Sequence, residues 1–152
     1  MPGRSGPRHT QLLAWKACHE LAIQVHRSCR AWPTRDGRHL ADQARRAAFG
    51  AAATMAEGAA KRGAKEFRRY LDMSIGSLAE LSYALLLARD LGTLPAARWG
   101  ELEALRDHAG QLTWGLYAAI ARRARRPSSP NPPRDARAKA PAERPHPPER
   151  DH

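Results

Sequence analysis

The sequence has few of the residues that sheets, disulfide scaffolds and membrane spans require. β-Branched residues are scarce among the 152 positions, which disfavours strands. The two cysteines, Cys18 and Cys29, are too few for a disulfide framework, and on one helix they would lie roughly 16 Å apart. No window reaches about 18 uninterrupted apolar residues, and charged side chains interrupt the N-terminal apolar stretch. We therefore expect no membrane span and no secretory signal, and predict a cytoplasmic protein.

The sequence also lacks the motifs that carry catalysis or hold metals. It contains no HExxH or CxxC grouping and no glycine-rich phosphate loop. His19 and His26 share a helix face but have no further ligand beside them. The run at residues 76–80 (GSLAE) is not a nucleophile elbow, because it lies inside a predicted helix. We predict that the protein is not an enzyme and uses no cofactor or metal.

Acidic residues are fewer than basic ones, and the excess is unevenly placed. The chain has 26 Lys plus Arg and 15 Asp plus Glu, a net charge of +11. Residues 127–152 hold five basic and four acidic side chains, which leaves +10 in residues 1–126. The same stretch has eight of the twelve prolines and no large apolar side chain. We predict a flexible basic arm at 1–9, a folded domain at 10–126 and a disordered tail at 127–152.

What is present is an alanine- and leucine-rich pattern of four amphipathic segments. The first is predicted from about Thr10, as N-cap, to about Arg30. A turn at 34–38 precedes the second, which runs from about residue 40 to 56, with Gly58 as a C-terminal cap. The third starts after Gly63 and reaches about residue 91, and the fourth opens at Pro95 and ends near residue 126.

The apolar stripes predict how these helices pack. Residues 47–53 are almost all small, which indicates close approach of the second helix to its neighbours. Four amphipathic helices with short connections favour an all-α, antiparallel up-down-up-down four-helix bundle. The stripes on the first, third and fourth helices are Trp15, Cys18, Ala22, Val25 and Cys29; Phe67, Leu71, Ser74, Leu78, Leu81, Leu85 and Ala88; and Trp99, Leu102, Leu105, Ala109, Leu112, Leu116 and Ile120.

Antiparallel packing would bring eleven basic side chains to one end of the bundle. The acidic residues expected at the same end are Glu57 and Glu66 only. Such a field attracts polyanions, although arginines at helix ends also form ordinary solvated faces that offset the helix dipole. No stacking platform is expected, because Phe67 and Tyr70 fit the core pattern. The eleven are Arg4, Arg8, Lys61, Arg62, Lys65, Arg68, Arg69, Arg122, Arg123, Arg125 and Arg126; the last nine are the predicted nucleic-acid-binding residues.

Two carboxylates are predicted to be drawn towards the core. Glu57 and Glu80 are expected beside Arg46 and Arg69, where a catalytic pair is one use and a structural polar network that fixes helix register is the commoner one. We predict the structural network.

The middle of the chain resembles the four-helix-bundle protein family encoded in 23S rRNA intervening sequences. The resemblance covers roughly residues 12–121, and it rests on the order and spacing of several short runs. These are 15–17 (WKA), 20–22 (ELA), Trp32-Pro33, 43–48 (QARRAA), 55–58 (MAEG), 66–71 (EFRRYL) and 76–81 (GSLAEL). It implies a small bacterial protein with no known catalysis, whose relatives form closed rings, typically homopentamers. A related branch comprises the accessory variability determinant proteins of diversity-generating retroelements, basic pentamers that engage a reverse transcriptase and nucleic acid.

Two functional hypotheses follow from the charge and the resemblance. The first is a ring-forming bundle that binds RNA or DNA backbone through its basic end; the alternative is an accessory of a reverse transcriptase or another nucleic-acid enzyme. A reverse transcriptase gene alongside would favour the alternative. Three aromatic residues of the fourth helix, Trp99, Trp114 and Tyr117, are candidates for either ordinary core or a surface that seals the ring.

Overall fold

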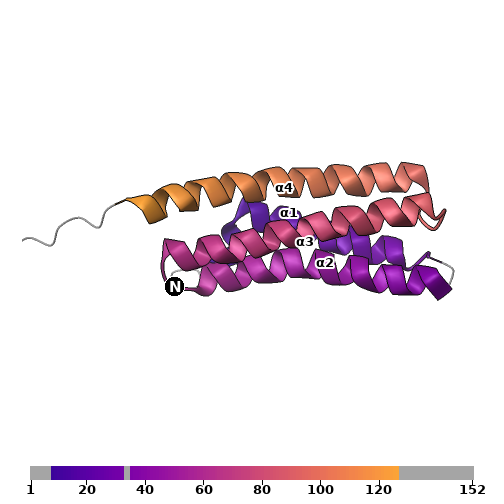
Figure 1. Cartoon of the computed structure of the whole chain (residues 1–152), viewed down its shortest axis with the longest axis horizontal. Helices are drawn as coiled ribbons and strands as arrows, with labels where there is room; N and C mark the ends of the chain where they lie inside the picture. The colour runs from indigo at the N-terminus through magenta and orange to yellow at the C-terminus, as the bar shows by residue number, and fades with distance from the viewer. Residues whose placement is uncertain (1–7, 33–34, 127–152) are drawn as a thin grey trace, which may run out of the picture.

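Four long helices form the body of the molecule. The computed structural model describes residues 8–32 and 35–126. The predicted tail and most of the predicted arm lie outside the described residues. A short 3-10 helix, η1 (Arg8–Gln11), precedes α1 (Leu13–Cys29), α2 (Arg35–Ala60), α3 (Ala64–Asp90) and α4 (Ala96–Arg125). The predicted all-α antiparallel bundle is confirmed, with successive helices running in opposite directions (Figure 1).

The helices follow one another around the bundle. α1 packs on α2, α2 on α3, α3 on α4, and α4 returns to pack on α1, while η1 lies against α1 and α2. Across the described residues, the backbones of the diagonal pairs, α1 with α3 and α2 with α4, do not approach each other closely. The bundle therefore has four faces, and the face between α1 and α2 is opposite the face between α3 and α4.

The core contains the predicted stripes with small shifts. All the seam residues of α3 are buried except Phe67, which is half-buried at the end of the bundle. On α1 the buried line runs through Leu21, while Trp15 and Ala22 sit at its edge. On α4 several stripe leucines are only half-buried. The contribution of α2 is mostly small side chains: Ala41, Ala44, Ala47, Ala48 and Ala51 are all buried.

The small residues of α2 let α3 approach closely. The hydroxyl of Ser74 donates to the carbonyl oxygen of Ala51 at 2.5 Å, across the interface of the two helices. A Cβ atom placed on Gly58 would lie 2.6 Å from the Cβ of Tyr70. Gly58 is therefore not the predicted C-terminal cap. It lies inside α2, which continues to Ala60, and its missing side chain makes room for α3.

Three predicted helix starts need correction. Thr10 lies within η1, and α1 begins at Leu13 with Leu12 as its N-cap and no capping side chain. α2 begins at Arg35, so most of the predicted turn is helical, because its first turns bury Leu40 and Ala41 against the core. Pro95 is the N-cap of α4 and not its first residue.

The connections on either side of α3 use glycine for its backbone freedom. Gly63 has a φ of +88° directly before the helix, and Gly92 has a φ of +76° directly after its C-cap. Residues with side chains are strained in this region. The predicted ends of α3 are confirmed to within one residue.

α3 is also the one described helix that is long and apolar enough to cross a membrane. Leu71, Leu78, Leu81 and Leu85 are all buried where α3 packs on α2 and α4, while Met73, Tyr83 and Leu86 are exposed. The buried leucines make α3 a core helix of the bundle.

Candidate nucleic-acid interface

The antiparallel order brings basic side chains from three parts of the chain to one end of the bundle, which we call the basic pole. Figure 1 shows the α2–α3 connection and the end of α4 at the same end, with the last turns of α4 extending beyond it. Of the eleven basic residues expected there, only Arg4 lies outside the described residues. The basic pole thus comprises Arg8, Lys61, Arg62, Lys65, Arg68, Arg69, Arg122, Arg123, Arg125 and Arg126.

Four of these cations surround one depression of about 870 Å³. Arg8 comes from η1, Lys61 and Arg62 from the α2–α3 connection, and Arg123 from the last turn of α4. Its inner wall includes Phe67 and other apolar side chains, and among the described residues no carboxylate lines it. The depression therefore offers an anion several cations and no competing acid.

Three more cations flank a second hollow of about 250 Å³ between α3 and α4. Lys65, Arg68 and Arg69 line it, together with the carboxylates of Glu66 and Asp72. Arg69 makes an ion pair with Glu66 at 3.3 Å, one turn apart on an exposed helix surface. An exposed pair of this kind contributes about 0–1 kcal/mol, so it holds the arginine only weakly.

Tyr70 has a role that the sequence pattern does not reveal. Its ring was expected in the core but is half-buried, with the Lys61 ammonium 5.6 Å from the ring centroid and the Arg69 guanidinium 4.9 Å from it. Cations over an aromatic face are attracted by about 0.5–1 kcal/mol at exposed sites. Tyr70 therefore links the α2–α3 connection to the first turns of α3 within the basic pole.

The remaining predicted residues lie on the last turn of α4. Arg122, Arg125 and Arg126 are exposed and line neither hollow. The Arg125 side chain donates to the carbonyl oxygen of Ala121 at 3.4 Å, in the last turns of α4. This contact places a positive charge at the negative end of the α4 dipole and leaves the other donors of the guanidinium facing solvent.

The four residues of the predicted polar network all lie on the surface. Arg46, Glu57 and Glu80 are exposed, and Arg69 is exposed and paired with Glu66. The two carboxylates are thus not drawn towards the core of the single chain, because alanine and leucine side chains fill it. A network among these four residues stays a prediction.

The two buried cysteines are poorly reactive. Cys18 Sγ lies 3.8 Å from the hydroxyl of Thr113, which itself donates to the carbonyl of Ala109 at 2.7 Å. Burial raises the pKa of Cys18 from 9.0 to about 11, and that of Cys29 likewise to about 11. Both thiols are therefore protonated at neutral pH, which makes them poor nucleophiles. In the described parts of the chain, no three His, Cys, Asp or Glu side chains gather to hold a metal ion.

Fold and surface together define a small all-α protein, an antiparallel four-helix bundle with one strongly basic end. The chain belongs to the 23S rRNA-intervening sequence protein family, whose model matches residues 10–115. This confirms the resemblance found in the sequence; the family consists of small helical proteins without a known catalytic role. No curated protein matches the chain. The matched region ends before the last turn of α4, so four arginines of the basic pole lie beyond it.

Proposed function

We propose that this protein is a non-catalytic, cytoplasmic, ring-forming bundle that binds the phosphate backbone of RNA or DNA through its basic pole. The observation that carries the proposal is the depression lined by Arg8, Lys61, Arg62 and Arg123, which gathers cations from separate parts of the chain without a carboxylate. Neutralising phosphates releases condensed counterions, which is the main source of nucleic-acid affinity that does not depend on sequence.

The surroundings of the depression add to its attraction for phosphate. α3 starts beside it, and Gly63 provides no side-chain cap for the first N–H groups of that helix. These N–H groups can donate to a phosphate held by the lysine and arginine side chains, while the α3 dipole only offsets the negative ends of the α2 and α4 dipoles at the same end of the bundle. Long exposed side chains recognise a charged backbone and not a base pattern, so the proposed binding depends on charge and shape.

Assembly into a ring would repeat the basic pole around one rim. Each copy adds its own depression, so that several weak phosphate contacts act on one nucleic-acid molecule at the same time. Linked sites of this kind raise the overall affinity well above that of one copy. The ring is part of the proposal; it is based on the family resemblance, which implies that relatives form closed rings.

Salt dependence tests the proposal directly. The full chain is titrated against a generic duplex and a structured RNA at about 50–200 mM salt. We expect binding at the lowest salt and a linear fall of log affinity with log salt. Absence of binding at about 50 mM salt, or binding that salt does not weaken, would overturn the proposal.

The last turn of α4 provides the matching variant. Replacing Arg122, Arg123, Arg125 and Arg126 by Ser should weaken binding by a similar factor for every nucleic-acid sequence tested and should lower the salt slope. A loss confined to one sequence would show base recognition in place of the proposed phosphate contacts.

A further inference from the structure

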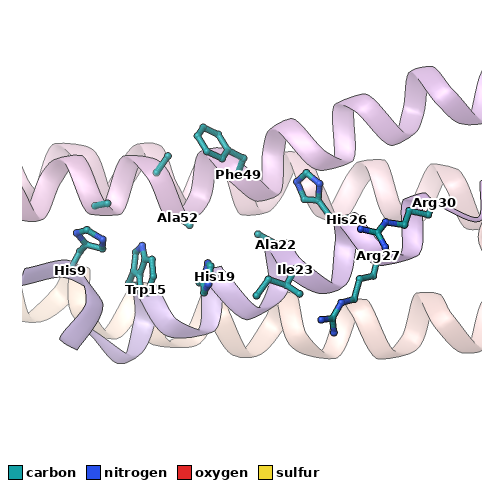
Figure 2. Close-up of a pocket in the computed structure, with 12 residues that line it drawn as sticks. His9, Trp15, His19, Ala22, Ile23, His26, Arg27, Arg30, Phe49 and Ala52 are labelled. Atoms are coloured by element: carbon teal, nitrogen blue, oxygen red, sulfur yellow. The ribbon is translucent and has the colours of Figure 1, made fainter. Parts of the chain in front are cut away.

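An apolar groove lies between α1 and α2, lined by other residues than the basic pole's depression. It has a volume of about 500 Å³ and a mostly apolar lining. Figure 2 shows Trp15 and Ile23 of α1 on one side of it and Phe49 and Ala52 of α2 on the other. Phe49 is 67% exposed, an unusual state for a phenylalanine in the middle of a long helix. The single chain therefore leaves this groove uncovered.

A second, different apolar surface lies between α3 and α4. Its hollow has a volume of about 220 Å³, lined by Ile75 and Ala79 of α3 and by Gly110 and Trp114 of α4. Trp114 is 55% exposed and packs edge-to-face on Tyr117, with ring centroids 5.5 Å apart. Of the three aromatic residues considered for ring sealing, Trp114 is the exposed one; Trp99 and Tyr117 are half-buried.

The two surfaces are on opposite faces of the bundle, because the helices contact one another in the order α1, α2, α3, α4. A self-paired contact between two copies would cover only one of them. A head-to-tail contact, in which the groove of one copy receives the α3–α4 surface of the next, would cover both in every copy. Such a contact makes a closed ring if the relation between neighbours is a rotation, and a filament if it also includes a shift.

Contacts inside the bundle set the two surfaces at the same height along its axis. Ala51 of α2 is level with Ser74 of α3, since their hydrogen bond is 2.5 Å long. Cys18 of α1 is level with Thr113 of α4, since their side chains are 3.8 Å apart. The groove residues Phe49 and Ala52 flank Ala51, and Trp114 follows Thr113. A contact between surfaces at equal height needs no shift along the axis, which favours closure into a ring.

Charge also favours the contact between unlike surfaces. Arg27 and Arg30 line the groove, and no carboxylate does so among the described residues. The α3–α4 surface carries Asp107, whose side chain is 59% exposed; Arg106 beside it is paired with Glu103 at 2.7 Å and with Asp107 at 3.5 Å, so two carboxylates share one guanidinium there. Opposite charges around two apolar patches attract each other, whereas two copies of the groove would repel.

We propose that a second copy of this chain occupies the α1–α2 groove through its α3–α4 surface, with Trp114 of one copy packed near Phe49 of the other. The contact rests on the ring in the proposed function and identifies the two surfaces that form it. Exposed aromatic residues at the centre of an interface carry much of its binding energy.

Two charge variants and their mixture test this contact. Phe49→Glu damages only the groove, and Trp114→Glu damages only the α3–α4 surface, so the introduced carboxylates repel each other where the two damaged surfaces would meet. Light scattering at micromolar concentration should show a ring for the unmodified chain and a monomer of 16.8 kDa for each variant alone. In an equal mixture, the Trp114 variant supplies an intact groove and the Phe49 variant supplies an intact α3–α4 surface. These two surfaces can form one contact only, so we expect a heterodimer of twice that mass, about 34 kDa, and no ring.

Leu13→Glu is the matched control, because Leu13 is also 67% exposed but lines neither surface; this variant should remain a ring. Circular dichroism and thermal unfolding confirm that each variant is folded. Should an aromatic substitution impair folding, Ala53→Glu in the groove and Ala79→Glu on the α3–α4 surface repeat the test without removing a large side chain.

The outcomes separate this inference from the proposed function. A ring that persists in either damaged variant, or a homodimer of one variant alone, overturns the assigned contact and leaves ring formation standing. A monomeric unmodified chain overturns both the ring and the contact. Salt-dependent nucleic-acid binding by that same monomer would leave the basic pole's role intact.

Discussion

The two ends of the bundle hold their arginines in different ways. At the end opposite the basic pole, Arg89 pairs with Asp90 at 2.8 Å and lies 4.2 Å from the Trp99 ring centroid. Arg98 pairs with Glu101 at 2.6 Å and donates to the Gln24 side chain at 2.9 Å. At the basic pole, Arg62, Arg123 and most of their neighbours have no ion pair within the described residues.

The difference shows what each set of charges can do. Arginines that are held by a carboxylate and an aromatic face join helices to one another and contribute to stability. Arginines without such partners repel one another and remain available to an external anion. Both ends contain arginines, so it is the partners of these side chains, and not the residue type, that distinguish the two ends.

The largest expected effect is on nucleic-acid affinity, and it separates the two ends. Lys61→Gln with Arg62→Gln at the basic pole should lower affinity at least about tenfold and reduce the salt slope by about two. Arg35→Gln with Arg38→Gln removes the same charge from the opposite end and should lower affinity much less. Fluorescence anisotropy over a range of salt concentrations measures both. Equal losses from the two pairs would mean that only total charge matters.

Helix packing at the two ends gives the next effect. Gly58→Ala places a Cβ atom 2.6 Å from the Tyr70 Cβ atom and should destabilise the fold by about 2 kcal/mol. Gly100→Ala, in the first turns of α4 at the opposite end, meets nothing within 4 Å and should stabilise it by about 0.5–1 kcal/mol. Urea denaturation measures both changes. A stabilising Gly58→Ala would show that α2 and α3 can separate there without cost.

A smaller effect on the unfolding free energy distinguishes Arg89, which has an ion pair and an aromatic contact, from Arg122. Arg89 and Arg122 both lie in the last turn of a helix. Arg89→Ala removes an ion pair and a contact with the Trp99 ring and should cost about 1 kcal/mol of unfolding free energy. Arg122→Ala should change it by no more than about 0.5 kcal/mol. The comparison fails if thermal unfolding shows the two variants to be equally stable.

Near neutral pH, the smallest effect comes from the two buried thiols. Their pKa values of about 11 in the fold exceed the ordinary value of 9.0, so the unfolded chain loses these protons first. Their contribution to stability should be complete below about pH 9 and decline towards pH 11. Cys18→Ala with Cys29→Ala should make this decline shallower. Ellman's reagent at pH 8 should label neither thiol until the chain unfolds; fast labelling of the native protein would contradict their burial.

Much of the fold could be predicted from local patterns. The heptad spacing of α3 predicted its buried face, and the glycines that flank it predicted its two ends. Both signals are local, because helix periodicity and the backbone freedom of glycine do not depend on distant residues. Prediction failed where distant contacts decide. Gly58 has the sequence context of a helix cap, but its neighbours are Tyr70 and Phe67 of the next helix. The start of α2 likewise depends on the burial of Leu40.

The candidate site divides in the same way. The charge excess and its place in residues 1–126 can be counted in the sequence, and the antiparallel order predicts one basic end. The sequence could not reveal that Tyr70 sits between Lys61 and Arg69, or that Glu80 is exposed. These are contacts between side chains, and they depend on how far each helix is rotated about its own axis.

By itself, the sequence determined that this chain forms four helices in antiparallel order and carries its positive charge in the folded part, because helix periodicity and charge are local properties. Only the tertiary structure decided which cations meet in one depression, where α2 and α3 touch, and that two unlike apolar surfaces remain uncovered on opposite faces. Those features depend on the rotation and height at which the helices pack, and packing of the whole core sets both.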